Sequence, residues 1–148
     1  MTASAETPDE ALVLEFFEPW ERRDIESILS FFTPDGSYID MPLPPRHGID
    51  AIRAYLTEIF GAFTVRIETL AIASRKDLVL TERVDYLIRD GHPTVDLPVM
   101  GIMRISNGKI AEWRDYLDLK TVEAGLGATY NATDDATDTV AVRAASSR

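Results

Sequence analysis

Cysteine is absent from this 148-residue chain, and histidine occurs only twice. Without cysteine there is no disulfide, no thiolate nucleophile and no cysteine-based zinc or iron–sulfur centre. The two histidines, His47 and His92, are too few for most histidine-based metal sites, and both lie in segments whose proline or glycine residues indicate loops. The sequence therefore predicts no metal and no cofactor. Any catalytic chemistry must therefore use carboxylates, tyrosine, arginine or the backbone.

Long apolar runs and an excess of positive charge are also missing. No run of about 18 apolar residues occurs, so no transmembrane helix is expected, and the first ten residues lack the pattern of a signal peptide. The chain has 25 Asp and Glu residues against 15 Lys and Arg, a net charge of −10. This charge repels phosphates and anionic lipid, so neither nucleic acid nor a membrane surface is an expected partner. We expect a cytoplasmic protein.

The composition that remains is typical of one globular domain, with 45% hydrophobic and 27% charged residues. Residues 1–6 are expected to form a flexible lead and residues 7–124 the domain. From residue 125 to 148 the sequence is rich in Ala, Thr and Asp without an apolar period, which predicts a largely disordered tail.

Apolar residues at helical spacing predict three helices in the first half of the chain. The first begins at a capping box formed by Thr7 and Glu10 and is expected to kink or end at Pro19. The second is capped by Asp24, and the third covers about residues 50–60.

Strands dominate the rest of the pattern. A turn at 33–36 precedes a short strand at 37–41. From about residue 63 to 119 the pattern indicates strands, including 78–88, 94–105 and 109–119, with turns at 76–77, 90–91 and 107–108. Helices followed by antiparallel strands predict an α+β fold with the helices on one face of a curved sheet.

Three of the predicted strands carry charged residues on faces that are otherwise apolar. Residues two apart share a face, which groups Arg83 with Asp85 and Tyr38 with Asp40, and sets Asp115 beside apolar neighbours. Buried charges are costly unless paired. Two nearby carboxylates raise the pKa of one of them while an arginine holds the other ionised, which is the arrangement acid–base catalysis needs. The same spacing also fits an ordinary salt bridge on a solvated face, because alternation does not show which face is buried.

Short motifs spread over residues 7–123 resemble the limonene-1,2-epoxide hydrolase family. They include Tyr-Ile-Asp-Met-Pro-Leu-Pro-Pro at 38–45, Thr-Glu-Arg-Val-Asp at 81–85 and Trp-Arg-Asp-Tyr-Leu-Asp-Leu at 113–119. The resemblance implies a cone-shaped fold of the SnoaL-like, nuclear transport factor 2-like type. In that fold a curved, mostly antiparallel mixed sheet packs against three to four helices from the N-terminal half of the chain, around a deep apolar pocket. It further implies a homodimer that adds water to a small apolar epoxide in one step, without metal, to give a vicinal diol.

Carried over residue by residue, the resemblance makes Asp115 the general base that takes a proton from water and Asp85 the general acid that protonates the epoxide oxygen. Arg83 bridges the two carboxylates, and Tyr38 helps to hold the water. Position 40 departs from the family, which usually has asparagine where this chain has Asp40. An ionised Asp40 accepts a hydrogen bond from water but donates none. A third carboxylate in the site either carries a proton or raises the pKa of Asp115.

Two other functions stay open at this point. Asp40, Tyr38 and Asp85 also fit an isomerase or polyketide-cyclase-like enzyme of the same fold with Asp40 as the base, and the fold also hosts non-catalytic modules that bind small ligands. Strand faces and the resemblance together predict a substrate pocket for a terpene- or cycloalkene-type epoxide. Its predicted lining is apolar: Trp20, Leu29, Leu56, Ile59, Leu87, Leu97, Val99 and Leu117.

Overall fold

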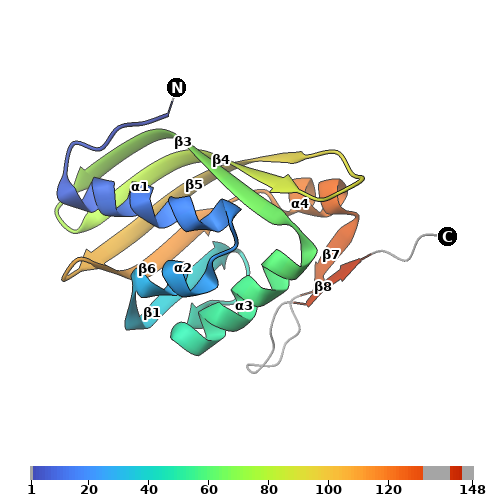
Figure 1. Ribbon diagram of the computed structural model, residues 1–148, viewed down its shortest axis with the longest axis horizontal. Coiled ribbons are helices and arrows are strands. Elements are labelled where there is room, and N and C mark those ends of the chain that lie inside the picture. The colour runs from blue at the N-terminus through green and yellow to red at the C-terminus, as the bar shows by residue number, and fades with distance from the viewer. Residues whose placement is uncertain (1, 132–140, 145–148) are drawn as a thin grey trace.

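The computed structural model describes residues 2–131 and 141–144. A curved six-stranded sheet forms one layer, and helices cover one of its faces (Figure 1). The helices are α1 (Pro8–Glu21), α2 (Ile25–Ser30), α3 (Ile49–Ala62) and α4 (Leu119–Leu126). The strands of this sheet are β1 (Phe32–Met41), β2 (Arg46–His47), β3 (Thr64–Arg75), β4 (Leu78–Ile88), β5 (Val95–Ser106) and β6 (Lys109–Tyr116). The predicted α+β class and the three early helices are confirmed.

Helix α1 begins as its capping box predicts. The Glu10 backbone N–H donates to the Thr7 hydroxyl at 3.2 Å, and the Glu6 N–H donates to the Glu10 carboxylate at 2.7 Å. The helix continues two residues beyond Pro19 rather than ending there. We attribute this to Trp20, whose buried ring fixes the last turn by packing edge-on against Phe16.

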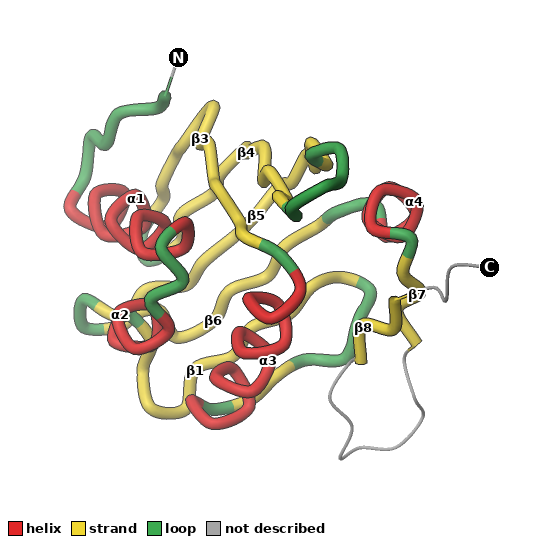
Figure 2. The backbone as a smooth tube through the Cα atoms, turned by 45° about the vertical axis from the view of Figure 1, so that its right-hand side comes forward, coloured by secondary structure: helices red, strands yellow, loops and turns green. Residues whose placement is uncertain are grey.

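The sheet has the order β2-β1-β6-β5-β4-β3, and β1 runs parallel to β6 while the other neighbours are antiparallel (Figure 2). The tight turn between β5 and β6 places Asn107 and Gly108 at φ 51° and 71°, as the Asn-Gly signal predicts. Residues 33–36, predicted as a turn, instead belong to β1. The pairing of β1 with β6 shifts register between Phe32 and Ser37, so the extra residues are taken up as an irregularity within the strand.

The chain after β6 differs from the prediction. The last strand ends at Tyr116 instead of residue 119, and Asp118 caps α4 by accepting from the Lys120 N–H at 3.2 Å. Beyond α4, β7 (Ala128–Asn131) pairs antiparallel with β8 (Ala141–Ala144), so part of the segment expected to be disordered forms strands. The remainder of that segment, 132–140 and 145–148, lies outside the described residues. At the other end, the N–H of Ala3 in the expected flexible lead donates to the Thr69 carbonyl at 2.9 Å.

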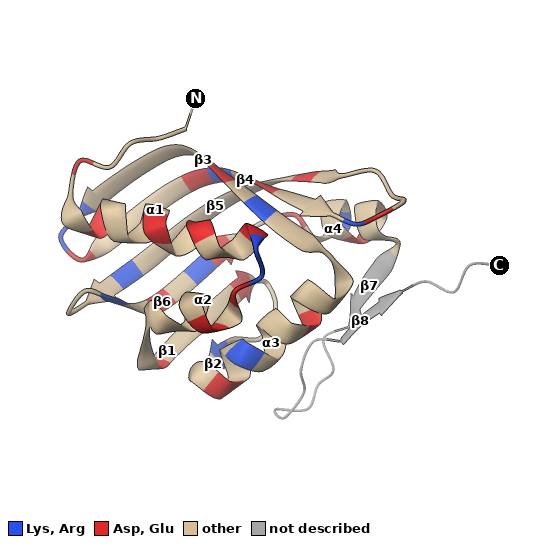
Figure 3. Ribbon diagram, in the orientation of Figure 1, with Lys and Arg blue, Asp and Glu red and all other residues tan. Residues whose placement is uncertain are grey.

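The core lies between the helices and the sheet. Its centre is aromatic, with Trp113 of β6 in contact with Phe16, Trp20 and Tyr38. Acidic residues recur along the outer side of α1, in keeping with the net charge of −10 (Figure 3). No helix in the described part of the chain is long and apolar enough to cross a membrane.

Candidate active site

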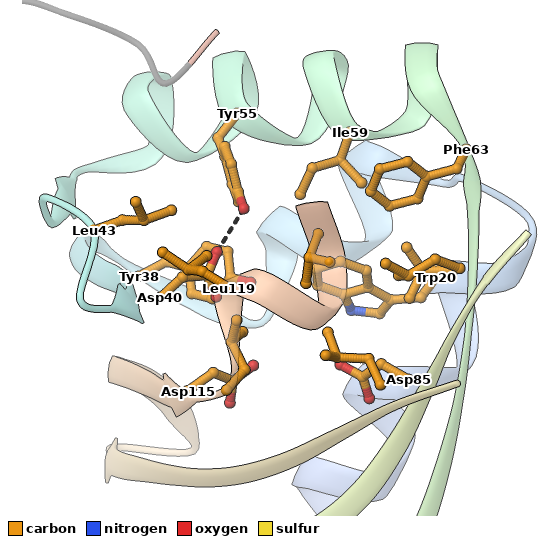
Figure 4. A pocket seen from close by; sticks show the side chains of 15 residues that line it. Trp20, Tyr38, Asp40, Leu43, Tyr55, Ile59, Phe63, Asp85, Asp115 and Leu119 are labelled. Atoms are coloured by element: carbon orange, nitrogen blue, oxygen red, sulfur yellow. Dashed lines mark hydrogen bonds between the residues drawn. The ribbon is translucent and has the colours of Figure 1, made fainter. Parts of the chain in front are cut away.

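A cavity opens between the sheet, α3 and α4. It contains about 520 Å³ of atom-free space, its open mouth included. Figure 4 shows Asp85 and Asp115 on the strand side, facing Tyr55 and Ile59 of α3. The lining is mostly apolar or aromatic: Trp20, Tyr38, Asp40, Leu43, Tyr55, Ile59, Phe63, Val65, Asp85, Leu87, Leu97, Asp115, Leu117, Leu119 and Val122.

Of the eight residues predicted to line a pocket, five do so: Trp20, Ile59, Leu87, Leu97 and Leu117. The other three are buried but lie outside the lining: Leu29, Leu56 and Val99. Helical rotation explains one of them, because Tyr55 and Ile59 share a side of α3 while Leu56 points into the core. In β5, Val99 is the register partner of Arg83 in β4, so it lies beside the arginine and not among the residues of the cavity wall.

Arg83 is the centre of the polar part of the site. Its guanidinium donates to both oxygens of Asp85, at 3.2 and 3.0 Å, and to both oxygens of Asp115, at 3.0 and 2.7 Å. Only 1% of Arg83 is exposed, so its face of β4 is the inner one. Burial alone would lower the pKa of Arg83, but the Asp115 and Asp85 carboxylates outweigh it and hold that pKa well above its ordinary value. The structure therefore brings together the three residues as predicted.

Asp115 is 2% exposed and is held from two sides. Besides its bonds from Arg83, it accepts from the Trp113 indole N–H at 2.6 Å. Burial raises the pKa of Asp115 to about 7. The Arg83 guanidinium opposes this rise, and the Asp85 and Asp40 carboxylates add to it. A carboxyl group with a pKa near neutrality both accepts and releases a proton at the pH of a cell, which suits a general base.

Tyr38 and Asp40 reach the same cavity from β1. The parallel pairing of β1 with β6 places Asp40 directly opposite Asp115. The Tyr38 ring stacks on Trp113 with centroids 4.3 Å apart. Burial, followed by the charge of Asp40, raises the pKa of Tyr38 well above its ordinary value, so its hydroxyl stays protonated at neutral pH.

The sequence analysis missed two polar residues beside Asp40. The Tyr55 hydroxyl donates to Asp40 Oδ2 at 2.5 Å (Figure 4), and Arg46 Nη1 lies 3.5 Å from the same oxygen. The sequence could have predicted Tyr55 as a site residue, since it lies one helical turn before Ile59. Arg46 gave no signal, because it follows two prolines in a segment whose pattern indicates a loop.

Close packing of the backbone allows the Arg83–Asp115 pair to form. Gly101 of β5 lies between Thr81 of β4 and Asp115 of β6 in register. A Cβ atom at this position would lie 2.5 Å from Arg83 Nη1 and 2.5 Å from Asp115 Oδ1. Only glycine leaves space for both groups.

The arrangement is suited to proton transfer on an apolar molecule. Two carboxyl groups share one buried guanidinium at the floor of a mostly apolar cavity, and a neutral tyrosine lies beside them. Within residues 2–131 and 141–144, no group of three or more His, Asp or Glu side chains is placed to hold a metal ion.

Comparisons with known proteins agree with the fold. A model of the SnoaL-like domain family matches residues 13–113. An LEH-like epoxide hydrolase of M. tuberculosis aligns with a TM-score of 0.71 and 24% identity over 81% of this chain and 92% of its own. A protein of Jannaschia sp. CCS1 described as a SnoaL-like polyketide cyclase aligns with a TM-score of 0.72 and 19% identity, over 84% of this chain and 96% of its own. SalBIII, an epoxide hydrolase/cyclase-like enzyme of pyran ring formation in salinomycin, aligns with a TM-score of 0.68 and 20% identity, over 76% of this chain and 92% of its own.

Proposed function

Since this chain belongs to the SnoaL-like domain family, whose fold the sequence resemblance implied, we propose that it is a metal-independent epoxide hydrolase. Its solved structural relatives include an epoxide hydrolase and a cyclase, so the fold by itself does not select the reaction. One observation carries the choice: Arg83 binds Asp85 and Asp115 at once, and both carboxyl groups face an apolar cavity.

In the proposed reaction, ionised Asp115 takes a proton from water while the water oxygen attacks an epoxide carbon. The carbon–oxygen bond breaks, and protonated Asp85 gives its proton to the leaving oxygen. The product is a vicinal diol, with Asp115 protonated and Asp85 ionised. Transfer of one proton from Asp115 to Asp85 through solvent restores the starting state, and the sum is one water added to one epoxide. Tyr38 holds the water, because its neutral hydroxyl both donates and accepts.

The lining of the cavity supports an apolar substrate. Leucine, isoleucine, valine and aromatic side chains form most of its wall, and its three carboxyl groups all come from strands of the sheet. This matches a terpene- or cycloalkene-type epoxide, whose only polar atom is the ring oxygen.

The proposal is tested by a single-turnover assay in ¹⁸O-labelled water with limonene oxide, cyclohexene oxide and styrene oxide. We expect a diol that carries the label on the first turnover, because water attacks directly. A diol that is unlabelled on the first turnover would show a covalent enzyme intermediate and contradict the mechanism. Absence of diol from all three substrates would contradict the function.

A second function is favoured by the contacts of Asp40. The Tyr55 hydroxyl on Asp40, together with Tyr38, resembles a carboxylate base flanked by phenols, as proton transfer next to a carbonyl requires. This supports an isomerase or cyclase-like enzyme as the alternative. Such an enzyme would exchange protons alpha to the carbonyl of ketone substrates in heavy water, and the exchange would be lost in Asp40→Asn. A protein that opens no epoxide and exchanges no such proton would be a binding module.

We further propose that the protein forms a homodimer through the outer face of its sheet. Four exposed large apolar side chains come from four neighbouring strands: Leu70, Leu80, Met100 and Tyr116. Leu70, Met100 and Tyr116 line one hollow on this face, and exposed apolar side chains grouped in this way can mark an interface. We expect Met100→Lys to shift the wild-type dimer to monomer in sedimentation velocity and Met100→Leu to leave the dimer unchanged. A monomeric wild-type protein at micromolar concentration would contradict the proposal.

A further inference from the structure

A second ion pair lies beside the one formed by Arg83. Arg46 of β2 is 8% exposed, and its guanidinium carbon lies 3.2 Å from the centre of the Tyr55 ring. Antiparallel pairing sets Arg46 opposite Tyr38, and Asp40 is two residues further along β1. Among the residues that the structure describes, Asp40 is the only carboxylate within ion-pair distance of Arg46. Strand pairing, a cation–π contact and a charge pair thus place this arginine beside the site.

Two of the three guanidinium nitrogens of Arg46 distinguish it from Arg83. Nη1 and Nη2 are buried and make no hydrogen bond to the residues that the structure describes, whereas the nitrogens of Arg83 bind two carboxylates. Arg46 therefore acts on Asp40 mainly through charge, at 3.5 Å. Tyr55 provides the hydrogen bond. Both contacts use Oδ2 of Asp40. No side chain among the described residues donates to Oδ1, and Asp40 lines the cavity, so this oxygen can accept a hydrogen bond from water there.

Counting charges shows what this arrangement does. The site contains three carboxyl groups, on Asp40, Asp85 and Asp115, and two guanidinium groups, on Arg46 and Arg83. One proton on the three carboxyl groups makes the cluster neutral. A neutral cluster is favoured because an uncompensated buried charge is costly. Epoxide opening also needs one proton, on Asp85, so the proton must not be held by Asp40.

We propose that Arg46 is a positioning residue: with Tyr55 it holds Asp40 as an ionised acceptor for the attacking water and leaves the one proton of the cluster to Asp85 and Asp115. This inference rests on the proposed hydrolase function and adds to it a joint role for Asp40, Arg46 and Tyr55. It also accounts for an aspartate at position 40, where a carboxylate without a counter-charge would compete for the proton.

The test follows the titrations of Asp40 and Asp115 by ¹³C NMR of their side-chain carboxyls, with the signals assigned from Asp40→Asn and Asp115→Asn. The charged groups that act on Asp115 are Asp40 of β1 and Arg83 and Asp85 of β4. Those in contact with Asp40 are Arg46 of β2 and Tyr55 of α3, with Tyr38 of β1 beside them. Arg46→Gln removes the counter-charge of Asp40, so we expect the midpoint of Asp40 to rise by about one pH unit. Asp40→Asn removes a negative charge beside Asp115, so the midpoint of Asp115 should fall by about as much.

Two further variants make the result specific. Arg66 lies over the ring of Tyr86 at 4.0 Å on the exposed side of β3, so Arg66→Gln removes an arginine–tyrosine contact of the same kind away from the site. We expect no shift in that variant. Tyr55→Phe keeps the ring below Arg46 but loses the hydrogen bond to Asp40, so it should raise the midpoint of Asp40 by less than Arg46→Gln. If Arg46→Gln does not fold, Tyr55→Phe carries the test, because it removes the second contact that holds Asp40 ionised.

The outcomes separate this inference from the proposed function. The titration needs no turnover, so it reports on Arg46 even if the wild-type protein opens no epoxide, a result that would overturn the hydrolase alone. In an active enzyme, the acidic limb of kcat/KM should move with the midpoint of Asp115, downward in Asp40→Asn. Folded Arg46→Gln and Tyr55→Phe variants that leave the Asp40 midpoint unchanged would overturn the inference and make the pair a structural contact only.

Discussion

Asp115→Asn is expected to lower kcat/KM for epoxide opening by about 10³-fold while the protein stays folded. Asparagine has the same shape and its oxygen still accepts from the Trp113 indole and from Arg83, so the contacts that hold the side chain survive in part. What is lost is the ability to take a proton from water. Steady-state kinetics on the best of the three epoxides, with circular dichroism as the check on folding, would measure the effect.

The matched control is Asp96→Asn on the exposed side of β5, which makes the same chemical change away from the cavity and should leave kcat/KM unchanged. Asp85→Asn is expected to lose activity to a similar degree, because it removes the proton donor to the epoxide oxygen. Near-wild-type kcat/KM in both Asp115→Asn and Asp85→Asn would show that these carboxyl groups are not the base and the acid.

Gly101→Ala should reduce both activity and stability, although the change adds only a methyl group. The added carbon would meet Arg83 Nη1 and Asp115 Oδ1, both at 2.5 Å, inside a closed ion pair. Either the pair separates or the strands move apart. We expect the free energy of unfolding to fall by about 1–3 kcal/mol, and kcat/KM to fall by about 10²-fold because Asp115 is displaced from the water.

Gly61→Ala in α3 provides the comparison. A Cβ at Gly61 meets no atom within 4 Å. Gly61 is the penultimate residue of α3, and alanine is favoured over glycine in the middle of a helix by about 0.5–1 kcal/mol, so a smaller gain is expected here. Urea unfolding should therefore show an unchanged or more stable protein, with wild-type kinetics. Wild-type values of both kcat/KM and unfolding free energy in Gly101→Ala would mean that the Arg83–Asp115 contact tolerates a wider spacing than the structure shows.

The sheet and the helices hold their residues of the site in different ways. Arg83 and Asp115 come from β4 and β6, which both pair with β5 in the sheet, so backbone hydrogen bonds fix their spacing. Tyr55 comes from α3 and Leu119 from α4, and these helices are not part of the backbone ladder of the sheet. Acid–base geometry is therefore set by the sheet, while the shape of the substrate space depends on the helices.

Local sequence signals determined much of the secondary structure of this protein. The capping boxes, the period of the helices and the Asn-Gly turn depend on neighbouring residues, and they were readable without the structure. Strand alternation also grouped Arg83 with Asp85 correctly, because the side-chain period of two is a property of one strand. The resemblance then linked these groups across strands. The limits of local reading appear at residues 33–36 and at α4, where pairing and packing outweighed the turn and strand signals.

Only the tertiary structure decided which face is buried, and that decides the chemistry. At 1% exposure Arg83 is a desolvated link between two carboxyl groups, whereas the same sequence on the outer face would be a solvated salt bridge of little consequence. The parallel pairing of β1 with β6 places Asp40 against Asp115, and a two-residue strand places Arg46 against Tyr38. Such contacts join residues far apart in the chain through pairing and burial, and no local pattern encodes them.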